Sequence, residues 1–412
     1  MDFTGTTFLP YRKEPPIWKD HVLWFALICV WTRLATNYMH NPFFAPNENF
    51  PYYLLSYRLE FTPRAVIGTI YDLLRSNLEI GWNTFCILRF AFCVLAYTLA
   101  TIGLYRLLNN IQDRCFASLF GLFLFAIPST FHPAAIITLF DHYLVAIMLT
   151  AVWLIQKGRS LPYLLVPPLC ILAVLIHENF LFMYLPFLVG VLVWQDEKHD
   201  RCRWLKASLV VFSTIGAFMA MFLRRSYLHK TPGMLDALNQ TLQQRAAEHG
   251  VELSNCLNTL ELTYWEHVKS VWSHFFLEQN SPYQLAINVI SLVIWIPALL
   301  VISSLWRNAW QQTQPELRRR LLMFGLSCFG GCALFIVAHD YIRWVTAILI
   351  CNSVALILLY TDERLHLRFN LTAGQMIRWC CISLFYLCLD PPSSVCFTVA
   401  DFLAYPVFKL CM

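Results

Sequence analysis

Three short stretches of the sequence place a histidine directly beside a carboxylate in apolar surroundings. The pairs are Asp141 with His142, His177 with Glu178, and His339 with Asp340. An ionisable group among apolar residues is costly unless it is paired or faces a wet cavity, so each pair suggests a functional site. A histidine next to a carboxylate can act as an adjustable acid or base, and burial can raise the pKa of a carboxyl group toward neutrality. We therefore predict that these six residues supply the catalytic groups of one site.

A structural interpretation competes with this one for any single pair. A turn between two helices lies near the lipid headgroups, and an aspartate there can simply cap a helix. All three pairs, together with Arg343, fall on the same side of the expected membrane. This shared depth favours a site over three unrelated turns.

Basic and aromatic residues near these pairs could bind a substrate. Arg343 offers a two-pronged donor for phosphate or carboxylate groups, and its neighbours Tyr341 and Trp344 could stack on a sugar or contact an isoprenoid chain. Arg64 and Arg75 flank or lie on an expected interfacial helix and could add phosphate contacts from the headgroup layer. These residue types predict an anionic, lipid-linked substrate that enters from the outer leaflet.

Other kinds of chemistry have less support. The residues after His177 and Glu178 are Asn179, Phe180 and Leu181, so the HExxH zinc motif is missing. A metal site assembled from separate turns stays open as an alternative. The sequence has no GxSxG motif, no P-loop and no GxGxxG motif. We expect neither a metal nor a cofactor.

The composition predicts the element type that must position these residues. Of the 412 residues, 58% are hydrophobic and 13% are charged, and the mean hydropathy is +0.54. Soluble domains carry about 25% charged residues, and a membrane-spanning helix needs about 20 apolar residues. We therefore predict an all-α integral membrane protein with about eleven transmembrane helices, in a range of nine to twelve. The expected spans are 20–37, 83–107, 115–131, 142–157, 161–176, 179–195, 204–223, 284–306, 320–338, 341–360 and 378–394.

The distribution of positive charge predicts how these helices are oriented. Connections on one side collect Lys and Arg, as at Arg106, Lys157 and Arg318, whereas the short turns on the other side hold almost none. Because cytoplasmic loops retain positive charge, the N-terminus is expected in the cytoplasm and the acid–histidine pairs at the outer face. The net charge of +5 follows largely from this asymmetry, so no nucleic-acid surface is expected. The first apolar run, at Val22, is expected to serve as an uncleaved anchor.

Two outer segments are long enough to have structure of their own. In the first, residues 39–82, apolar residues recur between Arg64 and Leu74 at a spacing typical of an interfacial amphipathic helix. The second, residues 224–283, is a large outer loop that glycine and proline divide into short helices. No internal repeat or flexible linker occurs, so residues 1–412 are expected to form a single polytopic membrane domain.

The overall layout resembles that of bacterial O-antigen and exopolysaccharide polymerases. The segments NENFPYYLLSYR and TPRAVIGTIYDLLR look like the first outer region of such proteins, although the acidic position is Glu48 and not an aspartate. The resemblance implies an inverting, metal-independent transfer of a glycan from one polyprenyl-diphosphate carrier to the non-reducing end of another. It places this reaction at the outer face of the bacterial cytoplasmic membrane.

The resemblance also implies roles for residues and partners. Arg343 and Arg64 would hold the diphosphate. Glu178, or Asp340 paired with His339, would deprotonate the acceptor hydroxyl. The implied partners are a polyprenyl-diphosphate-linked glycan, membrane lipid, and a flippase or chain-length regulator.

Two other functions remain open at this point. Membrane glycosyltransferases of the C-type fold, which use polyprenyl-phosphate sugars, are similar in having many spans and an outer site. They carry an essential carboxylate in the first outer loop, where this chain has Glu48, Glu60 and Asp72. A transporter or flippase would use the acid–histidine pairs as proton relays. Transporters usually show internal repeats and polar residues near the midplane, and neither is clear here.

Overall fold

The computed structural model describes residues 20–40, 50–127, 140–157, 160–195, 200–250, 253, 260–276, 293–336 and 341–388. Every regular element in these ranges is a helix, which confirms the predicted all-α class. In chain order the first group is α1 (His21–His40), η2 (Phe50–Leu54), α2 (Val66–Leu78), α3 (Trp82–Leu108), α4 (Arg114–Ala126), α6 (Asp141–Gln156), α7 (Ser160–Ile176), α8 (Phe180–Met183) and α9 (Leu185–Gln195). The second group is α10 (Asp200–Lys230), α11 (Met234–His249), α13 (Tyr264–Phe276), α15 (Ile296–Gln312), α16 (Pro315–Ser327), η3 (Gly330–Ile336), α17 (Tyr341–Tyr360) and α18 (Ala373–Cys388).

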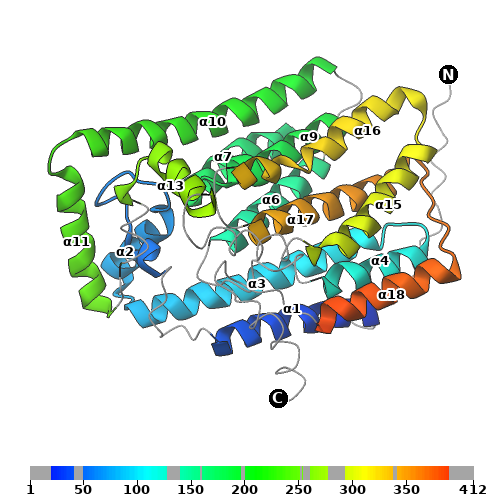
Figure 1. Cartoon of the computed structure of the whole chain (residues 1–412), viewed down its shortest axis with the longest axis horizontal. Helices are drawn as coiled ribbons and strands as arrows, with labels where there is room; N and C mark the ends of the chain where they lie inside the picture. The colour runs from blue at the N-terminus through cyan, green and yellow to red at the C-terminus, as the bar shows by residue number, and fades with distance from the viewer. Residues whose placement is uncertain are drawn as a thin grey trace.

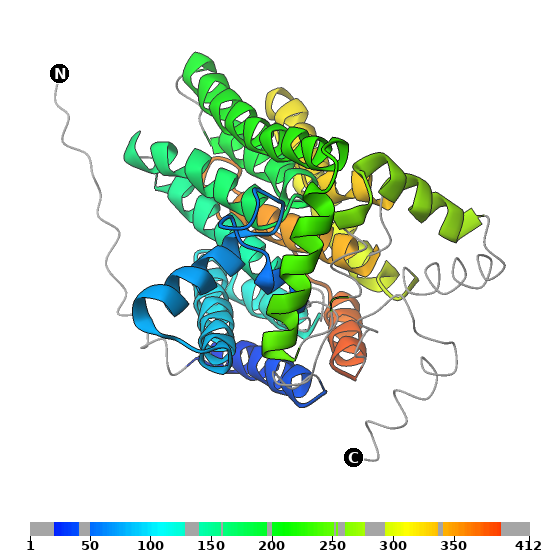
Figure 2. The ribbon, with the colours of Figure 1, turned by 90° about the vertical axis from the view of Figure 1, so that its left-hand side faces the viewer.

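Most of the long helices run along one direction, and three shorter ones gather at one end. Figure 1 shows α10 along one long edge of the bundle and α1 with α18 along the opposite edge. The helices α2, α11 and α13 lie together at the left-hand end of that view. Seen from that end, α11 crosses in front of the bundle (Figure 2). Of the predicted site residues, Arg75 lies on α2, and Arg64 lies just before it.

Among the residues that the structure describes, three segments are long and apolar enough to cross a membrane: Trp82–Leu108, Trp204–Lys230 and Arg343–Tyr360. The last of these, in α17, is wholly buried by the other helices, whereas in the first two, in α3 and α10, only 33% and 22% of the apolar stretch is buried. The exposed side chains of α3 and α10 include Ile87, Phe92, Leu99, Leu205 and Phe212. Exposed apolar surface on this scale is typical of a protein that contacts lipid or a partner.

Several expected spans coincide with single helices, and others do not. The ranges 20–37, 83–107, 142–157, 161–176 and 341–360 match α1, α3, α6, α7 and α17. The expected ranges 115–131, 284–306 and 378–394 are covered only in part, by α4, α15 and α18, and residues 128–131, 284–292 and 389–394 lie outside the described residues.

The expected span 179–195 is two helices and not one. α8 ends at Met183, and α9 begins at Leu185 with Pro186 in its first turn. Proline has no backbone N–H to donate and fits the first turn of a helix but not its interior. Pro186 therefore favours the start of a new helix at this position over the continuation of α8.

The expected span 320–338 is also divided, into α16 and the 3₁₀ segment η3. A Cβ atom on Gly330 would lie 2.5 Å from the carbonyl oxygen of Phe182 and 2.6 Å from Cγ of Pro186. Only glycine allows η3 to approach the α8–α9 junction this closely. The change from the α-helix α16 to the 3₁₀ segment η3 thus occurs where the chain packs closely against Phe182 and Pro186.

The helix α10 extends beyond the expected span 204–223. It continues to Lys230, so Arg224 and Arg225 belong to its last turns and not to the start of a loop. Both arginines have partners outside the helix: Arg224 binds Glu60, and Arg225 lies against the ring of Tyr264. A span predicted from hydrophobicity ends at the first charged residues and so misses this extension. In the structure, the contacts of Arg224 and Arg225 allow the helix to continue past them.

Candidate functional site

Glu178 lies in the short connection between α7 and α8. The backbone N–H of His177 still bonds to the carbonyl of Ala173, so the connection begins as a continuation of α7. The Nδ1 atom of His177 lies 3.3 Å from Oε2 of Glu178 and accepts a hydrogen bond from the backbone N of Asn179 at 3.2 Å. Both side chains are buried, with exposed fractions of 3% for His177 and 12% for Glu178.

Arg64 reaches this carboxylate from the residues that precede α2. Its Nη2 atom donates to Oε1 of Glu178 at 2.7 Å, and its Nε atom lies 3.4 Å from Oε2. Its guanidinium also sits 4.8 Å from the centre of the Tyr52 ring. The backbone of Arg64 is left-handed, with φ at 68°. A residue with a side chain pays about 1–2 kcal/mol for this conformation, so the surrounding structure holds Arg64 in a strained position against Glu178.

The charges around Glu178 keep it ionised. Burial alone would raise the pKa of its carboxyl group, but the guanidinium of Arg64 and the ring of His177 lower that pKa well below its usual value. Burial, followed by the charge of Arg64, lowers the pKa of His177, so its imidazole is neutral. The expectation of a carboxyl pKa raised toward neutrality is therefore wrong for Glu178, because the facing arginine outweighs the effect of burial.

A second acid–arginine pair lies beside the first. Asp141 is the first residue of α6, and Nη2 of Arg343, near the start of α17, lies 2.8 Å from its Oδ2 and 3.0 Å from its Oδ1. The side chains are 1% and 8% exposed. Phe140, next to Asp141, packs edge-on against the ring of His177 at 6.2 Å, and the charge of Arg343 contributes to the lowered pKa of that histidine. We call Arg64, Asp141, His177, Glu178 and Arg343 the deep cluster.

Two further predicted site residues are buried near the deep cluster. The ring of His142 is 1% exposed and lies 3.9 Å from that of Tyr143. Trp344 is fully buried, and its ring meets Phe335 edge-on at 5.5 Å. Trp344 is thus a packing residue, and the prediction that it stacks on a sugar is not supported by its position.

Three predicted residues cannot be placed in the same way. His339 and Asp340 lie outside the described residues. Tyr341 begins α17, but its side chain is also outside the described part of the structure.

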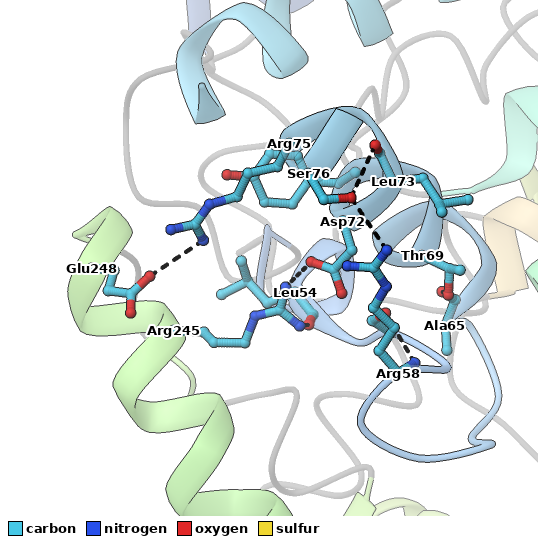
Figure 3. A network of polar contacts seen from close by, with 12 residues as sticks. Leu54, Arg58, Ala65, Thr69, Asp72, Leu73, Arg75, Ser76, Arg245 and Glu248 are labelled. Atoms are coloured by element: carbon cyan, nitrogen blue, oxygen red, sulfur yellow. Dashed lines mark hydrogen bonds and ion pairs between the residues drawn. The ribbon is translucent and has the colours of Figure 1, made fainter. Parts of the chain in front are cut away.

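Arg75 belongs to a different set of contacts. It pairs with Glu248 of α11 at 3.4 Å, and Arg245 of α11 binds Asp72 of α2 and donates from Nη1 to the carbonyl of Leu54 at 2.9 Å. Figure 3 shows these side chains bridging the two helices. We call Asp72, Arg75, Arg245 and Glu248 the clasp. The structure therefore separates Arg75 from Arg64, although the sequence suggested one phosphate-binding role for both.

One ion pair near the deep cluster was not predicted from the sequence. Arg224, on α10, donates to Glu60 from Nε at 2.7 Å and from Nη2 at 2.9 Å. These hydrogen bonds lower the pKa of Glu60. Glu60 and Arg224 are 164 positions apart, and only a double arginine at a helix end hinted at a partner.

Tyr264, at the start of α13, connects this region to the deep cluster. Burial raises the pKa of its phenol to about 12, and the charges of Glu178, Arg225 and Arg64 also act on it. Its ring stacks on Phe222 of α10 at 5.2 Å. The helix α13 thus packs against α10, and the charges of the deep cluster reach its first residue.

The deep cluster is suited to binding an anion. Each arginine holds a carboxylate with geometry that a phosphate group can replace, because both are planar-fork partners of guanidinium. The described residues contain no group of three or more His, Cys, Asp or Glu placed to hold a metal ion. No model of a known protein family matches the chain, and no curated protein matches it significantly.

Proposed function

We propose that this chain is a polytopic membrane protein of about eleven spans that transfers or polymerises a polyprenyl-diphosphate-linked glycan at the outer face of a bacterial cytoplasmic membrane. The observation that carries the proposal is the deep cluster, in which two buried arginines and two buried carboxylates meet at one end of an apolar helical bundle. Groups of this charge at the edge of a membrane domain mark substrate sites. The exposed apolar faces of α3 and α10 support the membrane location.

In this proposal, the two arginines bind the diphosphate of the glycan carrier. When the phosphate takes the place of the carboxylate on Arg64, Glu178 loses the partner that holds its pKa down. Burial then raises the pKa of Glu178 toward the range of a general base. Substrate binding and activation of the base would thus be one exchange of ion pairs.

The transfer step balances as follows. Glu178 takes the proton of the acceptor hydroxyl, and the acceptor oxygen forms a bond to the anomeric carbon of the donor glycan. The bond between that carbon and the phosphate oxygen breaks, and polyprenyl diphosphate leaves with the bonding electron pair. Arg64 and Arg343 compensate the charge on the leaving diphosphate. Inversion at the anomeric carbon follows from a single displacement.

The length distribution of surface glycan in the native host tests this proposal. The comparison includes the intact gene, its deletion, and the deletion complemented with Glu178→Gln or Arg343→Lys. We expect the deletion to lose long chains while single repeat units persist, and neither variant to restore them. Arg75→Gln, in the clasp, is the matched control and should restore long chains at equal protein level. A normal ladder in the deletion strain would exclude polymerisation.

A second candidate function rests on Glu60. This residue lies in the first outer segment, its side chain is 10% exposed, and Arg224 holds it with two hydrogen bonds. C-type glycosyltransferases, which this chain resembles in layout, use a carboxylate in their first outer loop. If Glu60→Gln abolished activity while Glu178→Gln retained it, transfer of single sugars from polyprenyl phosphate would be the better assignment.

A further inference from the structure

A pocket of about 400 Å³ lies between the last turns of α10 and the start of α13. Its walls include Arg225, Ser226 and His229 from α10, and Tyr264, Trp265 and Val268 from α13. None of these residues belongs to the deep cluster. The wall combines one arginine, several neutral hydrogen-bonding groups and apolar surface, and it includes no carboxylate.

Arg225 gives the pocket a fixed positive charge. Its side chain is buried, with the residue 5% exposed, and its guanidinium lies 4.4 Å from the centre of the Tyr264 ring. Its Nη2 atom donates to the carbonyl of Leu262, which anchors it to the segment before α13. Glu266, the acidic residue next to Trp265, bonds to the backbone N and hydroxyl of Thr263 at 2.8 and 2.7 Å. That carboxylate therefore caps the start of α13.

The Nε2 atom of His229, in the pocket wall, is buried and has no hydrogen-bond partner within the described part of the chain. The hydroxyl of Tyr264, in the same wall, interacts with the side chain of Arg225. A buried polar group without a partner is costly, and such groups are usually satisfied by a ligand or by water. His229, together with Arg225 and Tyr264, thus forms a set of donors for an anionic oxygen.

The position of the pocket indicates how its ligand would arrive. A helix of the length of α10 extends over about 45 Å, which exceeds the roughly 30 Å of hydrocarbon in a bilayer. Its last turns, which line the pocket, then lie at the depth of the lipid headgroups. The aromatic side chains of α13 are exposed here, with Trp265 at 66% and Trp272 at 48%, as is common for residues at a membrane interface. The pocket thus faces lipid, and the charges of Glu178 and Arg64 act on Tyr264 in its wall.

We propose that the α10–α13 pocket binds the phosphate end of an isoprenoid lipid, with Arg225, His229 and Tyr264 around the phosphate and Phe222, Trp265 and Val268 around the first isoprene units. This inference rests on the proposed function in one respect, namely that the chain handles isoprenoid-linked substrates. It adds a second lipid site beside the deep cluster. Such a site would hold a carrier before it enters the deep cluster or after it leaves.

Binding of radiolabelled farnesyl phosphate to the full-length chain in phosphatidylcholine nanodiscs tests this inference, with empty nanodiscs as the blank. We expect saturable binding that Tyr264→Phe and His229→Phe each weaken about three- to tenfold, the effect of one lost hydrogen bond. Both variants keep an aromatic ring, so packing is largely retained. Tyr227→Phe removes a hydroxyl from the same helix end outside the pocket and should bind as the wild type does.

Competition identifies the chemical class of the ligand. Unlabelled farnesyl phosphate should compete, whereas farnesol and inorganic phosphate should compete far less. Equal competition by farnesol would reduce the pocket to an apolar surface, and equal competition by inorganic phosphate would reduce it to a simple anion site. Loss of binding in nanodiscs that contain phosphatidylglycerol would assign the pocket to bulk anionic lipid. Each of these results, or wild-type binding by both pocket variants, would overturn the proposal.

The binding assay and the glycan assay fail independently. Binding without any effect of Glu178→Gln on glycan length would remove the proposed function and leave the pocket. Loss of long glycan in Glu178→Gln without binding of farnesyl phosphate would remove the pocket and leave the proposed function.

Discussion

The deep cluster and the clasp both contain arginine–carboxylate ion pairs at the same end of the bundle. They differ in what each arginine binds. In the clasp, Arg245 bonds to Asp72 and to the carbonyl of Leu54, so its donors hold one surface helix to another. In the deep cluster, Arg64 gives both donors to a carboxylate that also contacts the histidine ring of His177. The clasp thus joins α2 and the segment around Leu54 to α11. The deep cluster instead brings together charged groups that can exchange partners.

The comparison also concerns the backbone. Arg64 adopts a left-handed conformation to reach Glu178, whereas Asp72 and Arg75 lie on the regular helix α2. Backbone strain at a residue that contacts a buried acid is a common feature of functional sites. Burial by itself does not separate the two regions, because the Asp72–Arg245 pair is as buried as the Arg64–Glu178 pair.

The largest effect is expected from Asp141→Leu. This change leaves the charge of Arg343 buried without its carboxylate, and arginine does not deprotonate in proteins. We expect the free energy of unfolding to fall by about 3–5 kcal/mol at neutral pH. Titration with denaturing detergent in mixed micelles measures it. The double variant with Arg343→Leu should recover most of the loss, and a single variant as stable as the wild type would show that the pair contributes little.

Arg64→Met should destabilise the protein by an amount that depends on pH. In the wild type, His177 and Glu178 bind protons less tightly in the folded state than in the unfolded state. Their contribution to the free energy of unfolding is therefore complete above pH 6.5 for the histidine and above pH 4.5 for the carboxyl group, and it decreases below these pH values. Without Arg64, burial raises the pKa of Glu178. The variant therefore loses most of its free energy of unfolding at high pH, and this loss becomes smaller as the pH falls toward 4.5.

Unfolding titrations at pH 8 and pH 5 measure this difference. The destabilisation caused by Arg64→Met should be smaller at pH 5 than at pH 8, whereas that caused by Asp141→Leu should be similar at both. Equal losses at the two pH values for Arg64→Met would show that Glu178 does not depend on Arg64 for its charge.

A smaller effect is expected from Gly68→Ala, which loosens the support of the clasp. A Cβ atom at Gly68 would lie 1.8 Å from the carbonyl oxygen of Leu55, so α2 must move away from the segment after η2. We expect a loss of about 1–3 kcal/mol in the free energy of unfolding. Gly103→Ala, in the interior of α3 with no atom within 4 Å of its Cβ, is the control and should be neutral or stabilising. A neutral Gly68→Ala would mean that α2 is free to shift.

The smallest effect is expected from Arg75→Ala. Its pair with Glu248 is about half exposed on both sides, so its contribution to stability should be within about 0.5 kcal/mol. Added salt should reduce the difference further. The unfolding titration that resolves the loss in Gly68→Ala serves here as well, and a loss above 1 kcal/mol would place Arg75 among the structural residues of the clasp.

Local patterns in the sequence determined the class of the fold. Long apolar runs predicted helices at α1, α3, α6, α7 and α17, because each run meets the length and hydrophobicity of a helix without help from distant residues. The breaks at Pro186 and Gly330 were missed, although both residues carry a local signal. Whether proline starts a new helix or glycine permits a close contact depends on which helix lies opposite.

The sequence by itself determined that acids, histidines and arginines would occur near the ends of apolar helices at one side of the bundle. Only the tertiary structure decided which of them pair, because Arg64 and Glu178 are 114 positions apart and Asp141 and Arg343 are 202 apart. It also decided the charge state of Glu178, since burial and a facing arginine shift a pKa in opposite directions and their distances set the result. The separation of Arg75 from Arg64 has the same origin, as helical spacing places a residue on a face but does not choose its partner.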